Sequence, residues 1–218
     1  MNSARNREKV IAVGAATGGP VAVKELLASL PVECPGIVVT LQMPASFTRT
    51  FAERLNGLCT IKVKEAEDGE PILPGHAYIA PGDRNLLVDR SGGGCRISLA
   101  TAPLTKGFFP SIDVMFRSAA AAVGKNAIGI IMTGMGDCGA AGMLELHRAG
   151  AHTIAQDESS CLFFGMPQSA IAMGGVNHVV PLAEIPRHLI THLTSATRPP
   201  SAAGTSERSG GRAPAVGL

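Results

Sequence analysis

A chain of 218 residues is long enough for one domain with a sizeable core, because 45% of its residues are hydrophobic and 17% are charged. A net charge of +2 without clustered basic residues gives no basis for nucleic-acid binding. The five cysteines are scattered and contain no C-x-x-C pair, which argues against a zinc site and a disulfide framework. No apolar run reaches the roughly 18 residues of a membrane span, and Met1–Lys9 is polar, unlike a signal peptide. These features predict a reduced, cytoplasmic protein without membrane insertion.

The chain divides into three parts by composition. Residues 1–8 form a short polar lead, and residues 9–193 carry the pattern of a folded domain. Residues 194–218 are rich in Ser, Ala, Gly, Pro and Arg, and they cannot bury enough apolar surface to fold. We therefore expect one domain followed by a disordered tail.

Within the domain, short apolar runs alternate with helical patterns. The expected strands are 10–13, 37–41, 61–64, 77–80, 86–89, 95–99, 127–132, 153–156 and 178–180. The expected helices are 20–30, 47–56, 112–123, 140–149, 168–173 and 182–193. Strands that alternate with helices indicate right-handed crossovers. The sequence thus predicts an α/β fold with a doubly wound, mostly parallel sheet, helices on both faces, and a β-hairpin insertion near residues 77–99 at one edge.

Three loops follow strands at the end where open α/β sheets hold their sites. The first, residues 14–20, is rich in glycine and leads into a helix, so it offers free N–H groups to an anion or oxyanion. Hydrolases hold a serine nucleophile at such a turn, but its central residue here is Ala16. A dinucleotide site is disfavoured, because the spacing is not G-x-G-x-x-G and the second strand ends without an acidic residue.

The second and third loops, residues 41–47 and 133–139, also join apolar strands to helices. Taken alone, each is compatible with a capped turn. Ser46 is placed to cap the helix that begins near Phe47, and Asp137 the helix that begins near Gly139.

Taken together, the loops and their flanking segments resemble one known family, the chemotaxis protein-glutamate methylesterases (CheB), in their methylesterase domain. The shared motifs run in order through almost the whole domain. They are GA-x-TGGP at 14–20, MPASF at 43–47, FAERL at 51–55, EAEDGEPILPGHAYIAPGD at 65–83, PSIDVMF at 110–116, TGMG at 133–136, GAAGM at 139–143, and QDESS with FGMP within 156–167.

The resemblance implies a Ser/His/Asp hydrolytic triad, and all three of its positions are substituted here. The serine of the family's GASTGG turn falls on Ala16, the histidine of its QHMP segment on Gln42, and the aspartate before GAAG on Cys138. Ester hydrolysis by this route needs an oxygen nucleophile, a base and a carboxylate that orients the base. Alanine, glutamine and a neutral thiol supply none of the three, so we expect a catalytically inactive protein.

Other positions near the triad divide into changed and retained residues. The family's histidine and arginine before its PSVD motif fall on Phe108 and Phe109, two bulky groups that could fill the cleft, and a histidine after PGD falls on Asn85. The retained residues that the resemblance places along the cleft are Thr17, Gly134, Met135 and Gly136.

Several nearby side chains are candidates for substitute catalytic groups. Cys138 precedes a helix, where a thiol pKa can fall, but it would still need a base, and His147 and His152 lie on later elements. The hydroxyls of Thr17 and Ser46 fit caps or packing better. The six histidines show no metal spacing, so we expect no metal and no cofactor.

Two functions remain open. In the first, the chain is a pseudoenzyme in chemotactic signal transduction, which binds a methyl-accepting chemoreceptor or a similar helical signalling protein. In the second, it is an active methylesterase or glutamine deamidase that uses unconventional residues such as Cys138. A deliberately inactivated variant is disfavoured, because Gln and Cys are not the usual replacements. Family members often carry an N-terminal receiver domain, whereas the methylesterase-like part here begins near Met1, so we expect control through a partner.

Overall fold

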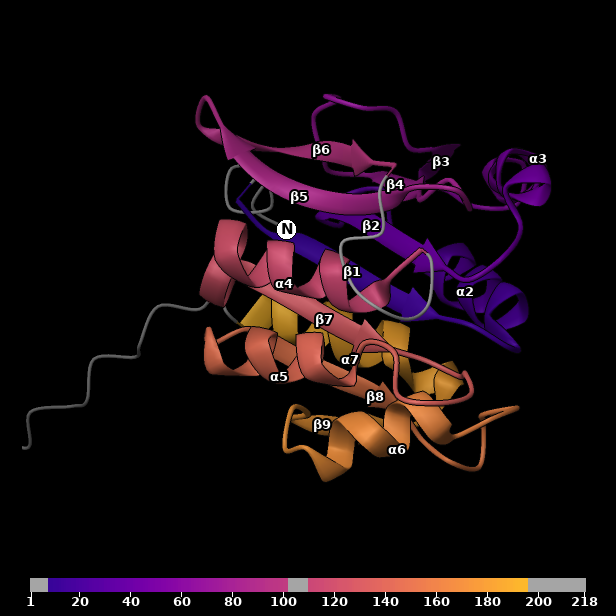
Figure 1. The fold of residues 1–218 in the computed structure, drawn as a ribbon, viewed down its shortest axis with the longest axis vertical. Coiled ribbons are helices and arrows are strands. Elements are labelled where there is room, and N and C mark those ends of the chain that lie inside the picture. The colour runs from indigo at the N-terminus through magenta and orange to yellow at the C-terminus, as the bar shows by residue number, and fades with distance from the viewer. Residues whose placement is uncertain (1–7, 102–109, 196–218) are drawn as a thin grey trace, which may run out of the picture.

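The computed structural model describes residues 8–101 and 110–195, and Figure 1 shows their arrangement. Seven strands form one parallel sheet in the order β3-β4-β2-β1-β7-β8-β9. These strands are β1 (Val10–Ala15), β2 (Gly36–Leu41), β3 (Lys62–Glu65), β4 (His76–Ile79), β7 (Ala127–Ile131), β8 (His152–Gln156) and β9 (His178–Val180). The predicted parallel α/β sheet is confirmed.

The central strands are uninterrupted apolar runs because both of their faces are covered. Every residue of β1, β2 and β7 is buried. A strand with one solvated face would alternate apolar and polar residues, whereas a parallel strand between two helical layers does not. The uninterrupted apolar run Val10–Val13 fits this central position.

Helices cover both faces of the sheet (Figure 1). They are α2 (Gly19–Ala28), α3 (Ala45–Asn56), α4 (Ile112–Val123), α5 (Ala140–Arg148), α6 (Gly165–Ala172) and α7 (Ile185–Ser195), with 3-10 turns η1 (Gly124–Asn126) and η2 (Leu182–Glu184). Helices α2, α3 and α7 contribute to one core, for example through Leu26, Leu55 and Leu189. Helices α4, α5 and α6 contribute to a second core, which contains Phe116 and Met143. Within the described residues, no helix is long and apolar enough to cross a membrane.

The predicted hairpin is present beside the β3–β4 edge of the parallel sheet, where residues 69–72 bond to it, but it forms a sheet of its own. Strands β5 (Asn85–Ser91) and β6 (Gly94–Ala100) form a separate antiparallel sheet. Its apolar residues Val88 and Ile97 lie in the same core as Phe116 of α4, because an apolar hairpin face must be buried and α4 supplies the partner surface. The segment near residue 77, which was assigned to the insertion, is β4 of the parallel sheet.

The order of strands creates a switch point between β1 and β7. After β1 the chain passes to α2 on one face, and after β7 it passes to α5 on the other. In doubly wound sheets, such a divergence opens a crevice at the carboxyl ends of the strands, where sites form. The carboxyl ends of the parallel strands lie on the right in Figure 1.

Candidate functional site

Ala16 lies in the crevice, where the loop after β1 meets the loop after β7. Its N–H donates a hydrogen bond to the Thr133 carbonyl (3.0 Å), and its own carbonyl accepts one from the Gly19 N–H (2.8 Å). Gly18 then starts α2 with a φ of 85°, which strongly favours glycine. The turn therefore has the tight geometry of a nucleophile-bearing loop, but the side chain that it holds is a methyl group.

Gln42 and Cys138 are in direct contact. Gln42 Nε2 donates hydrogen bonds to the Cys138 sulfur (3.3 Å) and to the Pro110 carbonyl (3.4 Å). The Gln42 N–H donates to the carbonyl of Ala15, the residue before Ala16 (3.1 Å). The structure thus brings the three triad-equivalent positions to one place at the carboxyl edge of the sheet.

The Cys138 thiol is held in its neutral form. Only 5% of the residue is exposed, and this burial is the main cause of a raised pKa. The carboxylates of Asp113 and Asp137 raise the pKa further, and hydrogen bonds from the backbone partly offset the rise. A thiol with a raised pKa carries little thiolate near neutral pH. Within the described residues, no hydrogen bond joins a histidine to Cys138, so no base is in place to activate it.

Asp113 fixes the loop that carries Cys138. Its carboxylate accepts hydrogen bonds from the N–H groups of Gly139 (2.8 Å) and Gly142 (2.7 Å) at the start of α5. The expected cap by Asp137 is wrong, because α5 has no side-chain cap from its own N-cap residue. The expected cap by Ser46 is also wrong, since α3 begins at Ala45 after Pro44 and has no side-chain cap.

A buried polar network supports the first and third loops from below. The Thr133 hydroxyl donates to the Thr17 carbonyl (2.9 Å), and the Thr133 N–H donates to Gln156 Oε1 (2.9 Å). Gln156 is fully buried at the end of β8, and its Nε2 donates to the Ser160 carbonyl (2.7 Å). Sequence reasoning overlooked this role, although a glutamine that ends an apolar strand is the signal for a buried polar partner.

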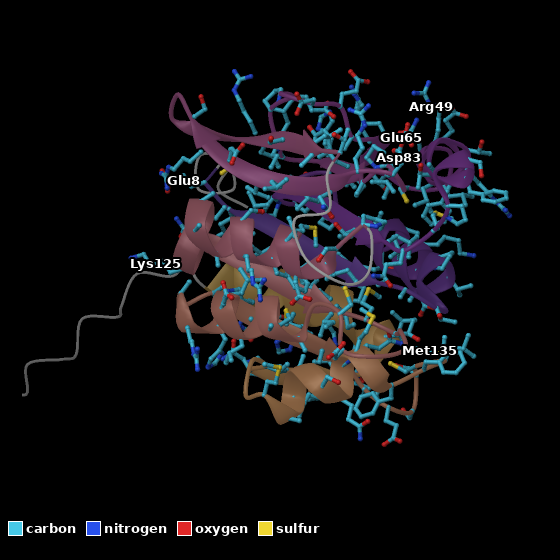
Figure 2. All side chains as sticks on the ribbon, viewed as in Figure 1. Glu8, Arg49, Glu65, Asp83, Lys125 and Met135 are labelled. Carbon is cyan, nitrogen blue, oxygen red and sulfur yellow. The ribbon has the colours of Figure 1, made fainter. Side chains whose placement is uncertain are left out.

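Exposed apolar side chains border the loops that carry Ala16 and Cys138. Met135 is 55% exposed, Leu162 67% and Phe163 41%, and we call these three residues the apolar rim. The Phe163 carbonyl accepts a hydrogen bond from Gly134 (2.9 Å), and the Leu162 Cβ lies 2.8 Å from where a Cβ on Gly18 would stand. Figure 2 shows Met135 at the carboxyl edge, well apart from Arg49, Glu65 and Asp83. The retained Thr17 and Gly136 are exposed beside the crevice.

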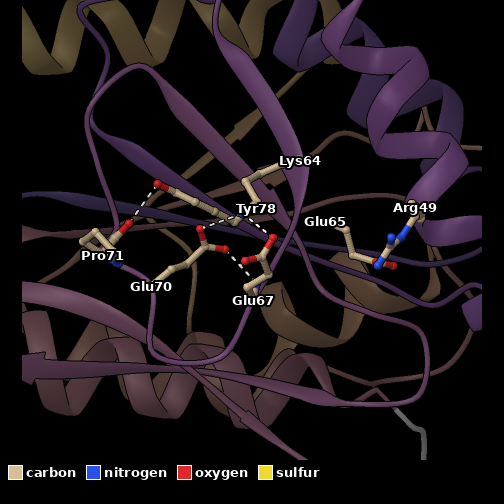
Figure 3. Close-up of polar contacts among 7 residues, drawn as sticks. All are labelled: Arg49, Lys64, Glu65, Glu67, Glu70, Pro71 and Tyr78. Atoms are coloured by element: carbon tan, nitrogen blue, oxygen red, sulfur yellow. Dashed lines mark hydrogen bonds and ion pairs between the residues drawn. The ribbon is translucent and has the colours of Figure 1, made fainter.

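A charged cavity of about 570 Å³ opens beside the second loop. Arg49 of α3 pairs with Glu65 of β3 (3.3 Å), and Lys64 pairs nearby with Glu67 (2.8 Å) and Glu70 (3.0 Å), as Figure 3 shows. The lining of this cavity does not include Ala16, Gln42 or Cys138. We therefore treat this cavity as a neighbouring surface feature rather than as the reactive centre. Its lining residues are Ala45, Ser46, Arg49, Thr50, Glu65, Ala66, Glu67, Asp68, Pro81, Asp83, Arg84 and Leu99.

Asn85 has a structural role in place of the histidine that the resemblance implies. The residue is buried, and its Oδ1 accepts a hydrogen bond from the N–H of Ser111 (2.8 Å), which caps α4. Asn85 therefore ties the hairpin to the start of α4. Phe108 and Phe109, expected to fill the cleft, lie outside the described residues.

A parallel sheet with helices on both faces and three loops that converge at its switch point defines the class of doubly wound α/β domains. Within that class, the chain belongs to the CheB methylesterase family, whose model matches residues 11–189. The resemblance stated from the motifs is confirmed.

Individual relatives agree with the family. The chain is 60% identical, over 188 residues, to a protein-glutamate methylesterase/protein-glutamine glutaminase 1 of Geobacter metallireducens, covering 86% of this chain and 52% of that protein. A Yersinia pestis protein-glutamate methylesterase/protein-glutamine glutaminase is 56% identical, with coverages of 86% and 54%. The chain thus spans about half the length of these relatives. The crystal structure of the Thermotoga maritima CheB methylesterase catalytic domain matches with a TM-score of 0.81 at 36% identity, covering 84% of this chain and 98% of that one.

Proposed function

We propose that this chain is a non-catalytic member of the methylesterase family, which binds a chemoreceptor-like helical segment without hydrolysing it. The observation that carries the proposal is the hydrogen bond between Gln42 and Cys138 beside the Ala16 methyl group. A neutral amide and a neutral thiol satisfy one another at the place where the reaction needs a base and its orienting carboxylate.

The alternative of an unconventional active enzyme is not favoured by the site. A cysteine nucleophile needs a thiolate and a base. Burial raises the pKa of Cys138, and its hydrogen-bonding side-chain partner is a glutamine, which takes up no proton near neutral pH. The same shortage of a base applies to deamidation of glutamine, which also requires attack on a carbonyl carbon.

The binding function is supported by what the crevice retains. The glycine turns of the first and third loops keep the backbone frame, and the apolar rim remains exposed around them. Exposed apolar side chains that gather next to a crevice are typical of interaction surfaces. The partner that fits this surface is a helix with an apolar stripe and a methylated glutamate or a glutamine that enters the crevice. By binding this helix, the chain would compete with an active methylesterase for the same receptor segment.

The experiment is a titration of a fluorescent, methylated receptor fragment with the purified chain. The double variant Met135→Asp/Leu162→Asp should bind at least about tenfold more weakly, because charges replace two apolar contacts of the rim. Val32→Asp is the matched control, since Val32 is 51% exposed but precedes β2, at the opposite edge of the sheet. Binding that both variants retain at full strength would contradict the proposed surface.

A further inference from the structure

Four histidines gather at the end of the sheet opposite the three loops. His152 begins β8 and His178 begins β9, while His188 and His192 lie one turn apart on α7. Because parallel strands start at one edge and end at the other, this cluster is separated from Ala16 by the length of the sheet. The inference drawn from it is independent of the proposed function.

The strand register and helix α7 bring the rings together. His178 pairs with Ile154, and the side chain of Ile154 points to the same face of β8 as that of His152, two residues earlier. Helix α7 packs on this face, since Leu189 and Leu193 share a core cluster with Ile154. His188 of α7 therefore approaches both strand histidines. Their separations along the chain, from 152 to 178 and from 178 to 188, follow no common metal spacing.

The nitrogen positions fit a small metal ion. One ring nitrogen from each of His152, His178 and His188 lies within 4.8 Å of the other two. His152 Nε2 and His188 Nε2 are 3.3 Å apart. Two nitrogens bound to a tetrahedral zinc ion at about 2.0–2.1 Å stand about 3.3 Å from each other, so this pair already has the required spacing. His178 is exposed, and a rotation of its side chain brings its nitrogen closer.

His192 is not part of the ligand set. Its ring lies flat against that of His152, with centroids 3.7 Å apart and planes 9° from parallel. His192 also lies outside the group of three histidines whose ring nitrogens approach within 4.8 Å of one another. His192 instead restricts the rotation of the His152 ring.

The chemistry of the ligand atoms also suits one class of metal. A neutral imidazole ring offers one nitrogen lone pair to a metal ion. The positive charge of Lys9 acts on His152 and opposes a bound cation. Imidazole ligands suit zinc, copper, iron and nickel, whereas magnesium and calcium prefer oxygen ligands.

We propose that His152, His178 and His188 form a binding site for one transition-metal ion of the zinc class, with water as the fourth ligand. Without metal, one of the two facing Nε2 atoms of His152 and His188 carries the proton of their hydrogen bond. When the metal binds, both Nε2 atoms turn lone pairs toward it and each of these two rings carries its proton on Nδ1, so the number of protons on His152 and His188 does not change.

The test is calorimetric titration of the full, tag-free chain with ZnCl₂ in a non-chelating buffer. The wild type should bind one equivalent. His178→Ala and His188→Ala should each weaken binding by at least about 100-fold, more than the 10–100-fold typical of residues that only support a ligand. His76→Ala is the control, because His76 begins β4 and lies outside the cluster, so it should change the affinity less than about twofold.

Titration with Co²⁺ separates histidine from cysteine coordination, since the chain has five cysteines. The expected spectrum has the visible bands of four-coordinate cobalt without the near-ultraviolet band of a thiolate ligand. His178 is exposed, so its variant should fold even if His188→Ala does not. Either a thiolate band, or one-equivalent zinc binding that is unchanged in His178→Ala, would overturn the proposal. An absence of saturable binding to the wild type would overturn it as well.

Discussion

The Gln42 side chain donates a hydrogen bond of 3.3 Å to the Cys138 sulfur, and so joins two loops that are 96 residues apart in the chain. This contact occupies the positions at which the family resemblance implies a histidine and an aspartate. It holds the second and third loops together without any group that can exchange a proton near neutral pH. Measurements on Cys138, on the three substituted positions and on the residues that support these loops can test this arrangement.

Cys138 should react slowly with alkylating agents in the folded protein. Iodoacetamide attacks the thiolate, and burial both raises the pKa of Cys138 and blocks access to its sulfur. At pH 8 we expect alkylation of Cys138 to be at least about 100-fold slower in the folded chain than in the denatured chain. Because a raised pKa moves thiolate formation to higher pH, the rate should increase only above the usual thiol range.

Mass spectrometry of the alkylated peptides measures this rate at each cysteine. Cys59 is an internal comparison, since it is only half-buried and its pKa is also raised by burial. A Cys138 that reacts faster than Cys59 at pH 7 would favour the thiol-enzyme alternative.

Restoring the triad should require all three side chains. Ala16→Ser alone should leave the chain silent, because the new hydroxyl has no base, and groups that act as a unit are strongly non-additive. Adding Gln42→His should give weak esterase activity, and adding Cys138→Asp should raise it by fixing the imidazole tautomer. The measurement is release of nitrophenol from an activated ester. A folded triple variant that is as silent as Ala16→Ser would show that the crevice has changed along with the triad.

Asp113→Ala should destabilise the protein by about 2 kcal/mol. The change removes two hydrogen bonds from a carboxylate to the N-terminal N–H groups of α5, and it removes a negative charge from the positive end of that helix. Urea denaturation gives the free energy of unfolding. Asp137→Ala is the control and should change it by less than about 0.5 kcal/mol, because Asp137 is exposed and its side chain does not cap α5. Equal losses in the two variants would contradict the capping role of Asp113.

Gly82→Ala should destabilise the second loop. A Cβ at this position would stand 2.2 Å from the Met43 carbonyl oxygen and 2.5 Å from the Ala45 nitrogen, and backbone atoms cannot move aside cheaply. We expect a loss of about 3 kcal/mol in the free energy of unfolding, at the upper end of overpacking effects. Gly94→Ala meets no heavy atom within 4 Å and should be nearly neutral. Similar denaturation midpoints for the two variants would disprove the close approach.

The sequence predicted the sheet well and the long-range contacts poorly. Short apolar runs such as Val10–Val13 alternate with helical patterns, so the element order and the α/β class followed from that alternation. The insertion was predicted to begin near residue 77, which lies in β4, because pattern alone does not show that this short strand pairs in parallel with β2 and β3. The Asp113 cap was missed because its partners Gly139 and Gly142 belong to a different helix.

The sequence predicted which loops form the candidate site, but not the contacts between their side chains. Motif order placed Ala16, Gln42 and Cys138 on neighbouring loops, but the hydrogen bond between the last two depends on side-chain geometry. The histidine cluster was overlooked, although His188 and His192 are four residues apart on one helix face, which is a recognisable signal. His152 and His178 join them only through the register of β8 and β9 and the packing of α7.

Methanol release from a methylated receptor fragment tests the central claim most directly. The chain should be assayed beside an active family member at equal concentration, with binding of the fragment measured in the same samples. We expect binding without turnover above the uncatalysed background that the assay resolves, because Ala16, Gln42 and Cys138 supply neither nucleophile nor base. Robust methanol release that survives repurification and is abolished by Cys138→Ala would contradict the account and identify the chain as a thiol-dependent esterase.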